Sequence, residues 1–155
     1  MQIHLIAMGQ RMPGWVNEGV DEFSKRMPPE CKLRWVEIPA GKRSKTSDIV
    51  RLMQQEGEKM IAAIPKGAMV VALDVKGKAW STEELSQQLT GWLQGGRDVA
   101  MLIGGPEGLA PACLELAELK LSLSKMTLPH PLVRVMLSEQ LYRAMSILKH
   151  HPYHK

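Results

Sequence analysis

Two short segments, Met69–Leu73 and Val99–Ile103, constrain the fold most, because every residue in them is apolar. A strand without apolar-polar alternation is typical of a parallel sheet that helices cover on both faces. Other β-prone segments alternate along the chain with segments of helical spacing. This alternation predicts an α/β fold with a parallel sheet and helices on both faces, but it does not order the strands. The other expected strands are Ile3–Met8, Leu33–Ile38 and Leu121–Leu123. Three of the expected helices are Trp15–Arg26, Pro111–Leu119 and Leu132–Lys149. Two more helices are expected to begin at their caps, one at Ser47 or Asp48 and the other at Ser81 with Glu84.

The length of 155 residues predicts a single domain over residues 1–155. The formal net charge of +4 permits an anionic partner without requiring one. The two cysteines form no C-x-x-C pair, so neither a disulfide framework nor a zinc cluster is indicated. The N-terminus lacks the features of a signal peptide, and no apolar stretch approaches the ~18 residues of a membrane span. We therefore expect a cytoplasmic protein with no metal and no membrane partner.

Basic residues gather in two places, a loop with Lys42, Arg43 and Lys45, and the tail His150–Lys155. Charge runs are often only solvated surface, but both segments have the chemistry to grip phosphate, and the tail also has an aromatic ring that can stack on a base. The tail's H-H-x-x-H pattern has no nearby carboxylate or cysteine to complete a metal site. Disorder of the tail is the alternative.

A glycine-rich segment, Ile103–Leu109, follows directly after a predicted strand. Ligands of open parallel sheets bind at the carboxyl ends of strands, where glycine permits close approach to the backbone. The segment lacks the Gly-Lys-Ser/Thr of a phosphate-binding loop and the spacing of a dinucleotide fingerprint. A ligand-contacting loop and a simple tight turn both remain open.

A second candidate segment runs from Leu121 to Pro131 and places His130 between two prolines. The prolines fix their own φ angles and restrict the residues before them. A rigid loop of this kind suits a small heterocycle such as adenine, and a rigid connector is the alternative. His130 alone is more often a hydrogen-bonded structural histidine than a catalyst.

The expected C-terminal helix, Leu132–Lys149, carries an apolar stripe wider than a surface helix needs. Burial by its own sheet and by a second subunit would explain this width, and so would an ordinary core position. Glu139 and Arg143 have the spacing of an i,i+4 ion pair. Arg134 has no such partner in the sequence.

Taken together, these segments resemble one family, the ribosomal large subunit methyltransferase H group within the SPOUT class of knotted methyltransferases. The resemblance spans nearly the whole chain and is specific in its order and spacing. The matching residues are Glu37–Arg43, Leu73-Asp74 with Gly77-Lys78, Leu102–Gly108, Leu121–His130, Arg134, Glu139–Ala144 and Tyr153-His154-Lys155.

This resemblance implies a sheet whose C-terminal part forms a deep trefoil knot, and a homodimer with active sites at the subunit interface. It implies methylation of N3 of a pseudouridine in 23S (large-subunit) ribosomal RNA, with the assembled ribosome as the expected partner. The implied cofactor is S-adenosylmethionine, in contact with Leu73, Gly104, Leu123, Ser124, Lys125, Met126, Thr127 and Leu128.

Methylation of an imide nitrogen needs positioning and removal of a proton. Our hypothesis is that His130 or His154 acts as the base or orders a water that does, and that Arg134 stabilises charge on the flanking carbonyls. Tyr153 would stack on or orient the base. Lys42, Arg43 and Lys45 would bind phosphates.

Two other functions stay open at this stage. A non-catalytic ribosome-binding or RNA-binding protein of the same fold would use the basic segments but leave the glycine turn without a role. A nucleotide-binding α/β enzyme, such as a dehydrogenase or a phosphate-transfer enzyme, is disfavoured by the missing glycine fingerprints.

Overall fold

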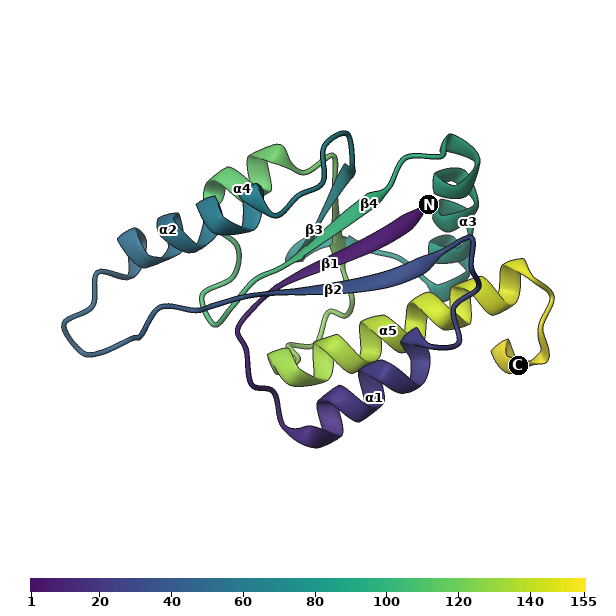
Figure 1. Ribbon diagram of the computed structural model, residues 1–155, viewed down its shortest axis with the longest axis horizontal. Helices are drawn as coiled ribbons and strands as arrows, with labels where there is room; N and C mark the ends of the chain where they lie inside the picture. Colours follow the sequence, from purple (N-terminus) through teal and green to yellow (C-terminus); the bar gives the residue numbers. More distant parts are fainter.

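The computed structural model describes all of residues 1–155 and contains one five-stranded parallel sheet in the order β2-β1-β4-β3-β5 (Figure 1). The α/β fold with a parallel sheet and helices on both faces is therefore confirmed. The strands are β1 (Gln2–Met8), β2 (Lys32–Ile38), β3 (Met69–Ala79), β4 (Val99–Ile103) and β5 (Leu119–Ser122); the helices are α1 (Gly14–Ser24), α2 (Ile49–Ala62), α3 (Thr82–Gly95), α4 (Pro111–Leu116), α5 (His130–Leu148) and the short 3-10 helix η1 (Pro152–His154).

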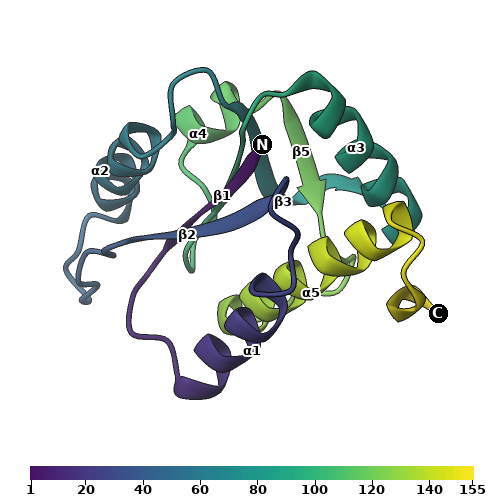
Figure 2. The same cartoon turned by 45° about the vertical axis from the view of Figure 1, so that its right-hand side comes forward.

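Alternate residues of the central strands point to opposite faces of the sheet and belong to two separate hydrophobic cores. In β4, Val99, Met101 and Ile103 face the core that α3 and α5 cover, whereas Ala100 and Leu102 face the core beneath α2 and α4. Helix α1 packs against α5 on the first of these faces. Figures 1 and 2 show α2 with α4 on one side of the sheet and α1, α3 and α5 on the other. Burial of β4 on both faces is the physical reason for its wholly apolar sequence.

Side-chain caps define the starts of two helices. The Ser81 hydroxyl accepts from the Glu84 backbone N–H at 3.0 Å, and the Glu84 carboxylate accepts from the Ser81 N–H at 3.2 Å, which completes the predicted capping box. Of the two candidate caps for α2, Asp48 is the one used, since its carboxylate accepts from the Arg51 N–H at 3.1 Å.

Two predicted boundaries were wrong near the edge of the sheet. Helix α4 ends at Leu116 rather than Leu119, because the Glu118 N–H donates to the Val70 carbonyl at 2.8 Å and Leu119 already pairs with β3. Strand β5 is correspondingly Leu119–Ser122 rather than Leu121–Leu123.

Strand β3 is longer than predicted, since it continues from Leu73 to Ala79 with a register irregularity where it passes β5. Gly77 allows this path, because a Cβ there would lie 2.8 Å from the backbone of β5. The deep trefoil knot stays a prediction. None of the helices is both long enough and apolar enough to span a membrane.

Candidate functional site

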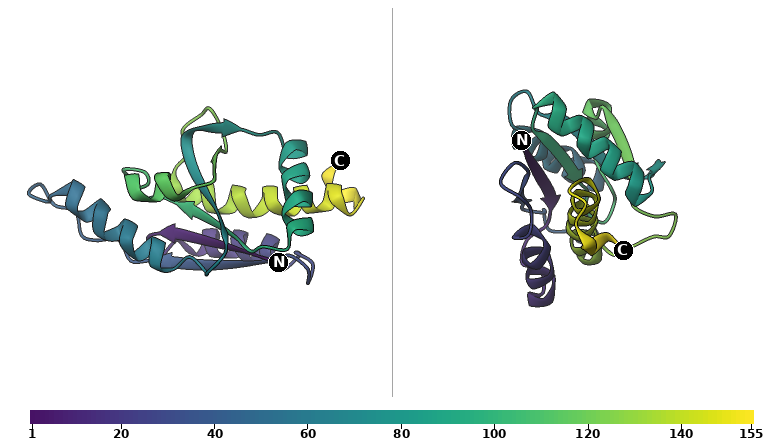
Figure 3. Two further views of the ribbon diagram at one scale, coloured as in Figure 1. Left: turned by 90° about the horizontal axis from the view of Figure 1, so that it is seen from above. Right: turned by 90° about the vertical axis from the view of Figure 1, so that its right-hand side faces the viewer.

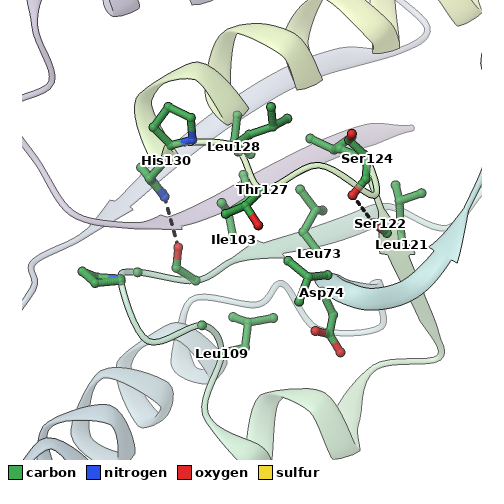
Figure 4. Close-up of a pocket in the computed structure, with 18 of the residues that line it drawn as sticks. Leu73, Asp74, Ile103, Leu109, Leu121, Ser122, Ser124, Thr127, Leu128 and His130 are labelled. Atoms are coloured by element: carbon green, nitrogen blue, oxygen red, sulfur yellow. Dashed lines mark hydrogen bonds between the residues drawn. The ribbon is translucent and has the colours of Figure 1, made fainter.

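The main pocket lies at the carboxyl ends of β4 and β5, against the middle of β3 at Leu73–Val75 and beside the start of α5, and has a volume of about 380 Å³ (Figure 4). Both candidate segments of the sequence, the glycine turn and the proline-rich segment, form its walls. The carboxyl ends of parallel strands meet at one edge of the sheet, which explains this convergence. The lining residues are Leu73, Asp74, Val75, Ile103, Gly104, Gly105, Pro106, Gly108, Leu109, Leu121, Ser122, Leu123, Ser124, Met126, Thr127, Leu128, Pro129, His130 and Val133.

Seven of the eight residues predicted to contact the cofactor line this pocket, and Lys125 is the one that does not. The Lys125 side chain is exposed. The seven come from three separate parts of the chain, near residues 73, 104 and 123–128, so their convergence is a property of the fold. Their role in cofactor binding stays a prediction.

The glycine turn between β4 and α4 is packed backbone against backbone. A Cβ on Gly104 would lie 2.5 Å from the carbonyl carbon of Gly108. The Gly108 N–H donates to the Gly105 carbonyl at 3.0 Å, and Gly108 has a φ of +85°, a conformation that favours glycine. The turn therefore brings peptide groups, rather than side chains, to the pocket.

Serine hydroxyls shape the opposite wall. The Ser122 hydroxyl donates to the Ser124 carbonyl at 2.9 Å, and the Ser124 hydroxyl accepts from the Met126 N–H at 2.9 Å. The Met126 side chain is 77% exposed at the rim. These local bonds hold the segment in a defined curve around the pocket (Figure 4).

His130, the first residue of α5, reaches the pocket but uses both of its ring nitrogens within the protein. Its Nε2 accepts from the Arg134 Nε–H at 2.9 Å, so the ring proton is on Nδ1, which donates to the Gly104 carbonyl at 3.1 Å. Burial lowers the pKa of His130, and the neighbouring Arg134 charge lowers it further. The imidazole is thus held neutral, as a bridge between β4 and α5.

Arg134 is 3% exposed and joins the ends of two strands, β1 and β2, to α5. Its guanidinium donates to the Glu37 carboxylate at 2.6 Å, to the Gly9 carbonyl at 2.9 Å and to the Met8 carbonyl at 3.3 Å. With the bond to His130 it makes four hydrogen bonds, against five available N–H donors. This arrangement favours a positioning role for Arg134, and stabilisation of substrate charge by Arg134 stays a prediction.

Tyr153 and His154 lie at the opposite end of α5 from His130 (Figure 3). The Tyr153 hydroxyl donates to Glu139 at 3.1 Å, and its ring packs 4.6 Å from Tyr142 and under the Arg143 guanidinium at 4.8 Å. Burial and the Glu139 carboxylate raise the pKa of Tyr153. The predicted Glu139–Arg143 pair is confirmed, with an N–O distance of 2.7 Å. His154 is exposed.

The structure therefore does not bring the four predicted catalytic residues together within one chain. Helix α5 has 19 residues, which at about 1.5 Å per residue is a length of about 28 Å. His130 and Arg134 are in its first two turns, whereas Tyr153 and His154 follow its last residue. No hydrogen bond or ring contact joins the two pairs within one chain, since Tyr153 turns back to Glu139, near the middle of α5.

The basic loop before α2 has two kinds of cation. Lys42 and Lys45 are exposed, as residues that bind phosphate must be. Arg43 instead pairs with Glu56 and with Glu107, and only 22% of its side chain is exposed. Phosphate binding stays a prediction for all three residues, but Arg43 already has carboxylate partners and the two lysines are exposed.

Several functional neighbours were not predicted as site residues. Asp74 puts a carboxylate in the pocket wall, Glu37 pairs with the buried Arg134, and Glu107 pairs with the partly buried Arg43. The position of Asp74 directly after the buried part of β3 was the available signal for it. Glu37 pairs with a residue 97 positions away, for which local sequence carries no signal.

Comparison with known proteins gives the family of the chain. A family model described as "Predicted SPOUT methyltransferase" matches residues 1–154, and the chain belongs to the SPOUT methyltransferase family. S-adenosylmethionine is the methyl donor that this family generally uses.

Two solved structures share the fold at low sequence identity. One is a probable methylase family protein from Haemophilus influenzae Rd KW20, with a TM-score of 0.57 at 11% identity over 99% of this chain and 70% of that one. The other is TrmJ from Z. mobilis ZM4, with a TM-score of 0.53 at 16% identity over 94% of this chain and 70% of that one.

Proposed function

We propose that this protein transfers the methyl group of S-adenosylmethionine to N3 of a pseudouridine in 23S ribosomal RNA, acting in the cytoplasm on the assembled ribosome. The observation that carries the proposal is the pocket formed by Leu73, Gly104 and the segment 123–128 in a SPOUT methyltransferase. The sequence resemblance to the large subunit methyltransferase H group supplies the nucleotide and the atom.

The pocket residues fit such a cofactor. A volume of about 380 Å³ lies within the range of about 300–1,000 Å³ that is usual for cofactor sites. Leucine side chains offer apolar surface to an adenine ring, while the glycine turn and the segment 123–128 offer peptide groups to its polar edge. When bound, the cofactor supplies a methyl group on a positively charged sulfur. In our proposal the segment 123–128 is the part of the chain that passes through the knot.

The proposal includes a homodimer, because one chain does not hold a complete site. The pocket, with His130 and Arg134, is at the start of α5, and the tail with Tyr153 and His154 is at its end. A second copy that packs along α1 and α5 in the opposite direction would place its tail beside the first copy's pocket. The exposed Trp15 on α1, 56% accessible, is suited to burial in this interface.

Removal of the N3 proton falls to the tail in this proposal. Both ring nitrogens of His130 are occupied, whereas His154 is exposed and lies next to Tyr153, whose ring can orient a base. His154 would accept the proton directly or through a water. His130 and Arg134 would keep the glycine turn and the strand ends in place, so that the methyl group and N3 approach in line.

The first experiment is mass spectrometry of ribosomal RNA nucleosides from a strain that lacks this protein. We expect loss of N3-methylpseudouridine and its return when the purified protein and S-adenosylmethionine are added to those ribosomes. An unchanged nucleoside profile would refute the assigned substrate. Calorimetry with S-adenosylhomocysteine separates an enzyme from a non-catalytic RNA-binding protein, since the latter should bind none.

A mixing experiment tests the composite site. Gly104→Ala damages the pocket and leaves the tail intact, whereas His154→Ala does the reverse. If the two variants exchange subunits at random, about half of the dimers are heterodimers, and each heterodimer has one intact site out of two. About a quarter of the wild-type rate should therefore return. No gain over the separate variants would show that each chain works alone.

A further inference from the structure

The side chain of Arg43 joins the basic loop to the glycine turn of the pocket. Its guanidinium donates to Glu56 of α2 at 2.8 Å and to Glu107 of the turn at 2.7 Å. The Glu56 carboxylate also accepts from the Gly41 N–H at 2.7 Å. One arginine thus connects a loop, a helix and the turn that follows β4.

The two carboxylates are not equivalent. The Glu56 side chain is 9% exposed and sits on α2, which packs against α4 so closely that a Cβ on Gly57 would lie 2.7 Å from the Ala110 Cβ. Glu107 belongs to the turn whose other residues, Gly104–Pro106 and Gly108, line the pocket. Arg43 therefore connects the glycine turn of the pocket to a closely packed helix.

Arg43 is poorly placed to bind phosphate. If Arg43 turned toward a phosphate, the buried Glu56 carboxylate would lose its main partner. Hydrogen bonding to Arg43 is the chief reason that the pKa of Glu56 is lowered. The Arg43 Nε is itself buried without a hydrogen-bond partner. The guanidinium position is thus determined by the two carboxylates, even though one donor is left unused.

We propose that Arg43 is a positioning residue of the cofactor pocket, which holds the Gly104–Gly108 turn against α2 through Glu107. Lys42 and Lys45, two exposed neighbours in the same loop, do not share this role. The inference rests on the proposed function, because it concerns the affinity of that pocket for S-adenosylmethionine and its product.

The test is calorimetric titration of the full-length protein with S-adenosylhomocysteine. Arg43→Met should raise Kd about tenfold and Glu107→Gln about threefold, with the double variant no weaker than Arg43→Met because both act through one contact. Arg43→Lys should lie between wild type and Arg43→Met. The matched controls Lys42→Met and Lys45→Met should leave Kd within twofold of wild type.

The inference is overturned if wild type binds and both Arg43→Met and Glu107→Gln keep Kd within twofold, even where their melting temperatures fall. If Arg43→Met does not fold, Glu107→Gln decides alone, since it leaves the Arg43–Glu56 pair intact. Absence of binding by wild type would instead refute the proposed function, and this inference with it.

A second measurement separates positioning from phosphate binding. The slope of log K for RNA binding against log salt concentration should fall in Lys42→Met and in Lys45→Met by the equivalent of about one phosphate contact each. The slope should stay unchanged in Arg43→Met. A weaker salt dependence in Arg43→Met, together with an unchanged Kd for S-adenosylhomocysteine, would make Arg43 a phosphate ligand.

Discussion

Replacement of Arg134 by methionine should destabilise the protein far more than the same change at a surface arginine. Methionine keeps most of the apolar stem but removes four hydrogen bonds, to Glu37, His130 and the Met8 and Gly9 carbonyls. Glu37 is partly exposed and regains water, so the cost comes mainly from the less accessible carbonyls and the histidine.

The expected loss of stability is about 3 kcal/mol. A buried polar group left without its partner costs about 1–3 kcal/mol, and the Met8 carbonyl and His130 Nε2 are both affected. For a chain of this size about 1 kcal/mol shifts Tm by roughly 2–4 °C, so Tm should fall by roughly 6–12 °C.

Thermal and urea unfolding of Arg134→Met, Glu37→Gln and Arg97→Met would measure these differences. The matched control is Arg97, whose side chain is 53% exposed and pairs with Glu118 at 3.1 Å, a surface pair worth less than about 1 kcal/mol. Glu37→Gln keeps an acceptor for Arg134 and should cost less than Arg134→Met. Equal losses for Arg134→Met and Arg97→Met would refute the argument that Arg134 fastens the strand ends.

Three further predictions concern the pocket and the buried groups. Gly104→Ala should abolish S-adenosylhomocysteine binding in calorimetry, because its Cβ would meet the Gly108 backbone at 2.5 Å, whereas Gly91→Ala, with open space around it, should bind normally. The pKa of His130 is lowered in the folded state, so the unfolded chain binds the proton first as pH falls. The stability of the protein should therefore decline below about pH 6.5, the pKa of histidine in the unfolded chain. Unfolding measured at pH 7.5 and at pH 5.5 should show a smaller decline in His130→Gln than in wild type. Burial raises the pKa of Cys31 to about 11 and raises that of Cys113, so a thiol reagent at pH 8 should label both only after denaturant is added, and rapid native labelling of either would contradict the structure.

The parallel sheet was predictable from the sequence, because the apolar residues of a single strand already show that the strand is buried on both faces. Every residue of Val99–Ile103 is apolar, and the observed strand has the same bounds. The capping box at Ser81 was equally local, since both partners lie within four residues. The end of α4 was not, because the bond from Glu118 to Val70 depends on a strand 48 residues away.

The site was predictable to a different extent. Wall residues were found through family motifs and through the ends of strands, and the structure brings seven of them to one pocket. The partners of Arg134 and Arg43 were not found, because charge in a sequence does not show which cations are buried in pairs and which are free. Arg43, Lys42 and Lys45 form one basic cluster in the sequence, yet only the two lysines are exposed.

The distribution of polar groups around the pocket fits transfer of an already activated methyl group. Arg134, His130 and Arg43 are each committed to partners within the protein, and the walls consist largely of peptide groups and aliphatic side chains. Such a pocket can position a donor, and the Asp74 carboxylate is the one ionisable group in its walls that has no side-chain partner. If the acceptor nitrogen has to lose a proton, the Asp74 carboxylate is the group available within these walls, and in the homodimer proposed above the exposed His154 of the second copy is the alternative.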